Sequence, residues 1–226
     1  SDMPAVCART FDARAALAIA ALAFVIRCAW GLAAGVTPGA AFDDSLWYHR
    51  VATTLAAGSG YTSPISGQPT AAWPPGYPFV LALGYRLLGA GPATAVVMNA
   101  VFGALTCLLV ARLGARLAGP RAGLLAAALL ACYPGHVFFA ALVLSETLFT
   151  CLVCGLLLAA VARLAGALAA RPLRWLAWGI GVGATALVRA ESVVLVLVPA
   201  VSLAWAGERR AAARILAATA VGALLA

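Results

Sequence analysis

The sequence predicts an all-α membrane protein, a polytopic helical bundle with about seven transmembrane helices. Its 226 residues are 65% hydrophobic and only 10% charged, and the mean hydropathy is +1.02. Soluble domains are typically about half apolar and about a quarter charged. Apolar runs comparable to the ~20 residues that cross a bilayer recur along the whole chain, which excludes a single anchor or signal segment.

The basic residues predict the orientation of the chain. All fifteen are arginines, and the formal net charge is +8. That charge would suit nucleic-acid binding in a soluble protein, but these arginines lie in short clusters between apolar runs, as the positive-inside rule describes. Arg9 and Arg14 precede the first run, so we expect a cytoplasmic N-terminus and no nucleic-acid partner. High alanine without lysine favours a GC-rich bacterial source and a multi-pass protein of the inner (plasma) membrane.

The first span is expected at about residues 15–36. Residues 37–92 are rich in glycine and proline and are expected to form an extracytoplasmic loop with two juxtamembrane helices. Its apolar stretch 78–88 is short for a span, and an interfacial position puts the later arginine clusters on the cytoplasmic side. The remaining spans are then expected at residues 94–111, 121–133, 136–162, 173–189, 192–205 and 215–226.

We interpret residues 1–226 as a single transmembrane module. Its apolar end leads us to expect that the natural polypeptide continues further. Gly179, Gly181 and Gly183 in one expected span favour close helix packing over ligand contact. Cys151 and Cys154 form a C-x-x-C pair, but within an apolar helix and without a second pair this favours packing over a metal or redox site. The six cysteines do not predict a disulfide framework.

Polar residues gather at one side of this predicted topology. Most come out at the extracytoplasmic face, and Glu146 lies somewhat deeper. Ionisable residues gathered at one leaflet of an otherwise apolar bundle indicate a functional site. The residues at the face are Asp43, Asp44, Tyr48, His49, Arg50, His136, Arg189 and Glu191.

The two aspartates also have a structural interpretation. Helical spacing places Asp44 and Tyr48 on one face, and Asp43 with Trp47 and Arg50 on a neighbouring face. One aspartate can act as a helix cap. A single cap does not account for both.

Three further residues carry the same two interpretations. Arg189 and Glu191 suit a simple polar turn, although the guanidinium also matches the oxygens of a lipid phosphate. His136 follows Pro134 and Gly135, so we interpret it as a turn histidine rather than a catalytic one.

Two charged residues fall inside expected spans. Glu146 lies about ten residues into its span, roughly 15 Å deep, and Arg27 reaches nearly the same depth from the other side. Unpaired, each would cost on the order of 3 kcal/mol. We therefore predict that Arg27 and Glu146 pair inside the bundle.

Five short motifs follow one another along the chain. They are Asp44-Ser45-Leu46-Trp47-Tyr48, Ala56-Ala57-Gly58, Trp73-Pro74-Pro75-Gly76-Tyr77-Pro78, Ser145-Glu146-Thr147-Leu148 and Leu187-Val188-Arg189. Together they resemble the GT-C superfamily of membrane glycosyltransferases, which includes lipid A aminoarabinose transferases and protein O-mannosyltransferases. The resemblance covers nearly the whole chain. It implies inverting transfer of a sugar from a polyprenyl-phosphate carrier to an acceptor hydroxyl on the extracytoplasmic side.

The resemblance also implies roles for individual residues. The family's catalytic Asp falls on Asp44, four residues before Tyr48. Many relatives carry a second acid after this position, where this chain has Ser45, so Asp43 stays an alternative base. A carboxylate there can take the proton of an acceptor hydroxyl, and a guanidinium can stabilise the departing phosphate. The expected substrate-binding residues are Tyr48, His49, Arg50, Glu146, Arg189 and Glu191.

The expected partners are a polyprenyl-phosphate sugar donor, membrane lipids and an acceptor that the sequence does not identify. No cofactor is expected. A divalent cation near Asp43, Asp44 and Glu191 stays an unsupported alternative, because these carboxylates lack the spacing of a cation site. A second hypothesis is a non-catalytic, lipid-binding membrane scaffold of the same fold. A transporter ranks last, because its ionisable residues would line a path through the midplane.

Overall fold

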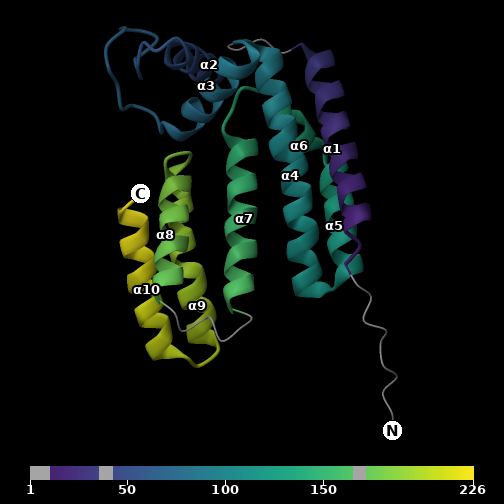
Figure 1. Ribbon diagram of the computed structural model, residues 1–226, viewed down its shortest axis with the longest axis vertical. Coiled ribbons are helices and arrows are strands. Elements are labelled where there is room, and N and C mark those ends of the chain that lie inside the picture. The colour runs from purple at the N-terminus through teal and green to yellow at the C-terminus, as the bar shows by residue number, and fades with distance from the viewer. Residues whose placement is uncertain (1–10, 36–42, 165–171) are drawn as a thin grey trace.

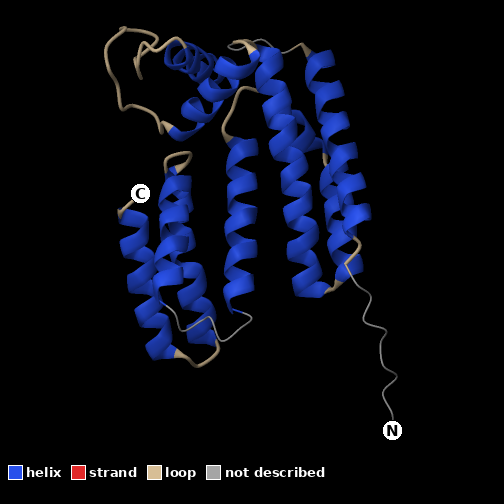
Figure 2. Ribbon diagram, in the orientation of Figure 1, coloured by secondary structure: helices blue, strands red, loops and turns tan. Residues whose placement is uncertain are grey.

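The structure is a helical bundle with two helices lying across one end (Figures 1 and 2). The computed structural model describes residues 11–35, 43–164 and 172–226, and over these ranges it contains helices, loops and one isolated β-bridge, between Thr62 and Pro69. The helices of the bundle are α1 (Ala13–Ala34), α4 (Pro92–Ala118), α5 (Pro120–Cys132), α6 (Pro134–Ala140), α7 (Glu146–Leu164), α8 (Pro172–Ala186), η2 (Ala190–Val196), α9 (Leu197–Trp205) and α10 (Arg209–Leu224). The all-α prediction is confirmed.

The helices stand where spans were predicted, but not all are long enough to cross a bilayer on their own. Within the described residues, α1, α4 and α7 are sufficiently long and apolar, and α5 with α6, bent by 56°, adds a fourth if the pair is one span. Helices α8 and α10 have 15 and 16 residues, which is about 22–24 Å of helix. Length and hydropathy therefore support three or four of the seven predicted crossings.

Helices α2 (Asp43–Ala56) and α3 (Gly76–Leu88) lie across one end of the bundle, which we call the α2–α3 end (Figure 1). The 13 residues of α3 make only about 20 Å of helix, so the two juxtamembrane helices predicted between the first two spans are confirmed. Tyr48 of α2 packs edge-on against Tyr77 of α3 at a centroid distance of 5.2 Å. This contact joins the α2 motif to α3.

Helix α7 stands between two groups of helices, α1, α4 and α5 on one side and α8, α9 and α10 on the other (Figure 1). The close packing predicted for the glycine-rich span is confirmed. A Cβ on Gly179 or on Gly183 would overlap backbone atoms of α10, and one on Gly222 would overlap the backbone of α8. Trp178 of α8 donates through Nε1 to the carbonyl of Leu156 in α7, at 2.9 Å.

The predicted continuous span 136–162 is wrong. Helix α6 ends at Ala140, residues 141–145 are buried but not helical, and α7 begins at Glu146. Asn99 of α4 stabilises the break, because its Nδ2 donates to the carbonyl of Leu142 at 2.6 Å. Glu146 is consequently in the first turn of a helix rather than ten residues inside one, and a carboxylate is favoured at a helix N-terminus.

The predicted pairing of Arg27 with Glu146 is also wrong. Arg27 is fully buried, and its guanidinium donates to the carbonyls of Ala131 and Leu130, both at 3.1 Å, and to that of Ala23 in its own helix at 3.0 Å. The physical reason is the chain break after α5. The carbonyl of Leu130 cannot bond the amide four residues on, because Pro134 has no N–H. It accepts instead from the N–H of Tyr133, at 3.2 Å, and from the arginine.

Gly103 of α4 makes room for the Arg27 side chain, because a Cβ there would overlap the Arg27 Cδ and Nε. We therefore expect Gly103→Ala to push the guanidinium off its carbonyl partners and to lower the free energy of unfolding by about 1–3 kcal/mol. Thermal unfolding in detergent measures this. The matched control is Gly155→Ala in α7, where the added Cβ meets only Leu109 Cδ1 at 3.8 Å. Equal melting temperatures for the two variants would contradict the assigned role of Arg27.

Candidate functional site

A cavity of about 330 Å³ lies at the α2–α3 end, between α2, the start of α7 and the turn after α8. Its walls come from four separate parts of the chain. The residues that line it are Asp44, Tyr48, Trp73, Pro74, Leu144, Ser145, Glu146, Val188, Arg189, Ala190 and Glu191. Five of the eight predicted site residues are thus brought together in one cavity, which we call the first cavity.

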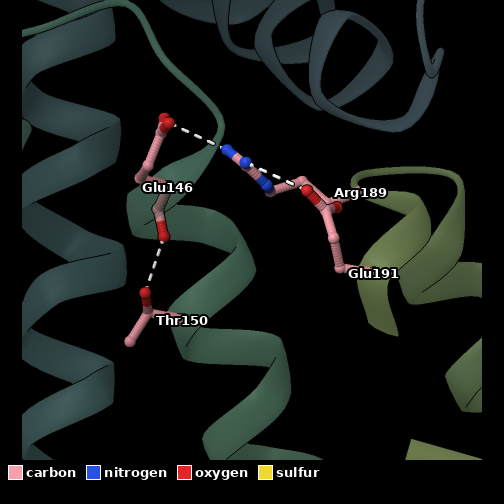
Figure 3. A network of polar contacts seen from close by, with 4 residues as sticks. All are labelled: Glu146, Thr150, Arg189 and Glu191. Carbon is pink, nitrogen blue, oxygen red and sulfur yellow. Dashed lines mark hydrogen bonds and ion pairs between the residues drawn. The ribbon is translucent and has the colours of Figure 1, made fainter. Parts of the chain in front are cut away.

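Arg189 is the charged centre of this cavity. Its Nη1 donates to Glu146 Oε1 at 2.8 Å, and its Nη2 donates to Glu191 Oε1 at 3.2 Å (Figure 3). Its guanidinium carbon also lies 5.7 Å from the ring centroid of Phe149, within cation–π range. The Arg189 and Glu146 side chains are each about one third exposed (33% and 34%), and Glu191 is 66% exposed. The guanidinium is therefore held in place yet remains accessible to a ligand.

Asp44 and Tyr48 face the first cavity from α2, as their helical spacing predicts. Asp44 is exposed, whereas Tyr48 is buried against the Trp73 ring at a centroid distance of 5.9 Å. Burial raises the pKa of the Tyr48 hydroxyl and outweighs the hydrogen bond with Ser145, which lowers it; the nearby carboxylates raise the pKa and Arg189 lowers it. Tyr48 thus stays neutral and can donate a hydrogen bond. The side chain of Asp43 lies outside what the structure describes.

His49 and Arg50 do not face the first cavity. They line a separate hollow of about 460 Å³ on the other side of α2. His49 Nδ1 lies 2.7 Å from the hydroxyl of Tyr85 in α3, so this histidine joins the two juxtamembrane helices. The physical reason is the 100° turn per residue of an α-helix, which directs neighbouring side chains to different faces.

The last two predicted residues, Glu146 and His136, come from α7 and α6. Glu146 lines the first cavity from the top of α7. His136 lies in the first turn of helix α6, which begins at Pro134, and it lines a neighbouring cavity that Glu146 also borders. No group of three His, Cys, Asp or Glu side chains that could hold a metal ion occurs in the described residues.

Trp73, Pro74 and Val188 belong to the site although sequence reasoning did not single them out as ligands. The signal was present in their motifs. Gly76, in the motif that begins at Trp73, donates its backbone N–H to the carbonyl of Leu187 at 2.7 Å. A Cβ on Gly76 would lie 2.8 Å from that same carbonyl. This close backbone contact holds two of the sequence motifs against each other beside Arg189.

The His49–Tyr85 contact predicts a pH dependence of stability. Burial and then the nearby Arg50 lower the pKa of His49 below its usual 6.5, so the unfolded chain takes up the proton first as the pH falls. The stabilisation is complete above about pH 6.5 and declines below it. We expect the melting temperature of the wild type to fall more steeply between pH 7.5 and 5.5 than that of His49→Phe. Parallel slopes would contradict a depressed pKa.

A comparison with known families places this site in context. The family model for dolichyl-phosphate-mannose-protein mannosyltransferases matches residues 72–226. The matched region contains Glu146, Arg189 and Glu191, and it begins after Asp44 and Tyr48. No curated protein and no solved structure shows significant similarity to the chain. The match extends over more than half of the sequence, and the chain therefore belongs to the dolichyl-phosphate-mannose-protein mannosyltransferase family of GT-C membrane glycosyltransferases.

Proposed function

We propose that this chain carries the reaction centre of an inverting glycosyltransferase, which moves a sugar from a polyprenyl-phosphate donor to an acceptor hydroxyl at the extracytoplasmic face of the bacterial inner membrane. One observation carries the proposal. A carboxylate, Asp44, and an accessible guanidinium, Arg189, share a single cavity beside the juxtamembrane helices. Such a pair supplies the two charges that the reaction requires, a base for the acceptor and a cation for the leaving phosphate.

Asp44 acts as the base in this proposal. It takes the proton of the acceptor hydroxyl while the acceptor oxygen forms a bond to the anomeric carbon. The bond between that carbon and the phosphate oxygen breaks at the same time, and the polyprenyl phosphate leaves with the electron pair. Asp44 is an exposed carboxylate of the cavity, so it can be reached by an acceptor from outside the bundle. Asp43 remains the alternative base.

Arg189 receives the phosphate in this proposal. A guanidinium has five N–H donors, and hydrogen bonds to protein acceptors in the described residues use one donor on each terminal nitrogen. The rest are available for phosphate oxygens. The contact to Glu191 is the longer of the two and the more exposed, so an incoming phosphate displaces Glu191 and leaves Glu146 in place. Glu146 then orients the guanidinium.

Binding of the donor lipid tests the role of Arg189. Native mass spectrometry with polyprenyl phosphate should show a retained carrier in the wild type and a loss of about tenfold or more in Arg189→Ala, because charge-assisted hydrogen bonds to the phosphate are removed. Arg86→Ala, an exposed arginine at the end of α3, is the matched control and should retain the carrier. Glu191→Gln should retain it more strongly, since a competing carboxylate is removed. Equal retention in Arg189→Ala and wild type would refute the role of Arg189.

Substitution of Asp44 distinguishes an enzyme from a lipid-binding scaffold. Asp44→Asn should lower the rate of sugar transfer by about 10²–10⁴-fold, the usual contribution of a general base, while the carrier is still retained. Asp43→Asn, measured in parallel, decides which of the two adjacent carboxylates is the base. Transfer at the wild-type rate in both variants would exclude either aspartate as the base.

A further inference from the structure

A second cavity, of about 270 Å³, adjoins Glu146, which also lines the first. Its lining comes from α6, with Tyr133 just before it, and from the first turns of α7. Glu146 is the one residue that lines both cavities. Its Oε1 accepts from Arg189 in the first cavity, and its Oε2 is buried with no hydrogen-bond partner in the described part of the chain.

His136 presents a hydrogen-bond donor at this second cavity. Its Nδ1 lies 3.1 Å from Arg27 Nη2, and because arginine only donates, this nitrogen has to accept. A ring that accepts at Nδ1 is neutral and carries its proton on Nε2. That Nε2–H is buried and has no acceptor among the described residues. Arg27 is therefore a positioning residue that sets the tautomer of His136.

Unpartnered polar atoms are concentrated around this cavity. The described residues contain six buried side-chain nitrogen or oxygen atoms without a partner, and three of them belong to residues that line the second cavity, namely His136 Nε2, Glu146 Oε2 and Thr147 Oγ1. A buried polar atom that is never satisfied lowers the stability of the folded state. The residues that line this one cavity thus carry an unpartnered donor, an unpartnered carboxylate oxygen and an unpartnered hydroxyl, which a bound ligand can satisfy.

The size and walls of the cavity narrow the chemistry of that ligand. A volume of about 270 Å³ is below the range of pockets for drug-sized ligands, so it suits a single ring. Tyr133 and Phe139 supply aromatic walls. A lipid chain would pack against the aromatic walls, but it would leave the buried polar atoms without hydrogen-bond partners, which is unfavourable. A sugar-like ring with several hydroxyls can pack against the aromatic walls and also bond the polar atoms, because each hydroxyl can donate and accept.

We propose that the second cavity holds the sugar ring of the lipid-linked donor, with His136 Nε2–H and Glu146 Oε2 bound to ring hydroxyls. This inference rests on the proposed function, in which Arg189 binds the phosphate in the first cavity. A sugar 1-phosphate has its ring and its phosphate on adjacent atoms, and Glu146 stands between the two cavities. The carboxylate thereby couples sugar recognition on one oxygen to phosphate recognition on the other.

The test compares carriers with and without a sugar. Binding is measured by native mass spectrometry for polyprenyl phosphate and for the same lipid carrying mannose, glucose or aminoarabinose. In the wild type we expect at least one sugar to improve binding over the bare carrier by about tenfold, as the newly made hydrogen bonds predict. No improvement with any of the three sugars overturns the proposal. No retention of any carrier overturns it together with the proposed function.

Two variants then locate the sugar. In His136→Asn the side-chain oxygen replaces Nδ1 as the acceptor for Arg27, but the Nε2 donor is lost. Thr150→Leu enlarges a side chain that lines the second cavity from α7. It also removes the hydrogen bond from Thr150 Oγ1 to the backbone carbonyl of Glu146, at 2.8 Å, but not a contact of the carboxylate that pairs with Arg189 (Figure 3). In both variants the sugar-carrying lipid should bind no more tightly than the bare carrier. The affinity for the bare carrier should stay within about twofold of wild type. Ser202→Leu is the matched control, because the Ser202 hydroxyl also bonds a carbonyl four residues back, at 2.8 Å, on an exposed helix face.

Three results separate the possibilities. His136→Gln, which places an amide N–H near the Nε2 position, should recover part of the sugar advantage. If the sugar-carrying lipid still binds both His136→Asn and Thr150→Leu more tightly than the bare carrier by the wild-type factor, the sugar ring binds elsewhere. The proposed function is then unaffected. A loss of the bare carrier in His136→Asn, at the melting temperature of the Ser202→Leu control, would assign the phosphate to this cavity and refute the sugar.

Discussion

Backbone carbonyls inside an apolar bundle need hydrogen-bond partners, and the chain around Pro134 leaves several of them without the usual helical amides. Arg27 bonds the carbonyls of Leu130 and Ala131, and Asn99 bonds that of Leu142. These two side chains stabilise two breaks, one between α5 and α6 and one between α6 and α7, that would otherwise be too costly inside the bundle. The second break ends α6 at Ala140 and starts α7 with Glu146. Both cavities depend on this arrangement.

The site combines a rigid frame with loosely held charges. Gly76 holds the loop before α3 against the residues that follow α8 through a backbone contact. The positions of Trp73 and Arg189 are therefore fixed relative to each other. The ion pairs of Arg189 are each at least one third exposed, and exposed pairs contribute little to stability. Their arrangement is therefore better suited to exchange with an anionic ligand than to holding the fold together. This is the property that a transient phosphate site requires.

The first cavity is rich in carboxylates, because Asp44, Glu146 and Glu191 face a single arginine. A phosphate entering it meets repulsion unless one of the acids withdraws. Glu191 is the acid that can do so, since it is largely exposed and makes the longer contact with Arg189. Glu146 is more enclosed and stays. The acids thus differ in burial and in their contact with Arg189, a distinction that residue type alone does not make.

Local rules predicted much of this protein from its sequence. Hydropathy and helical period predicted the all-α bundle, the juxtamembrane position of α3 and the shared face of Asp44 and Tyr48, because each depends on neighbours within a few turns. The Gly179 and Gly183 contacts followed from residue size. The partners of Arg27, the depth of Glu146 and the removal of His49 from the cavity did not follow, because they depend on which carbonyls Pro134 frees and on how α2 is rotated against α3. Such contacts join residues far apart in the chain, and only the tertiary structure decides them.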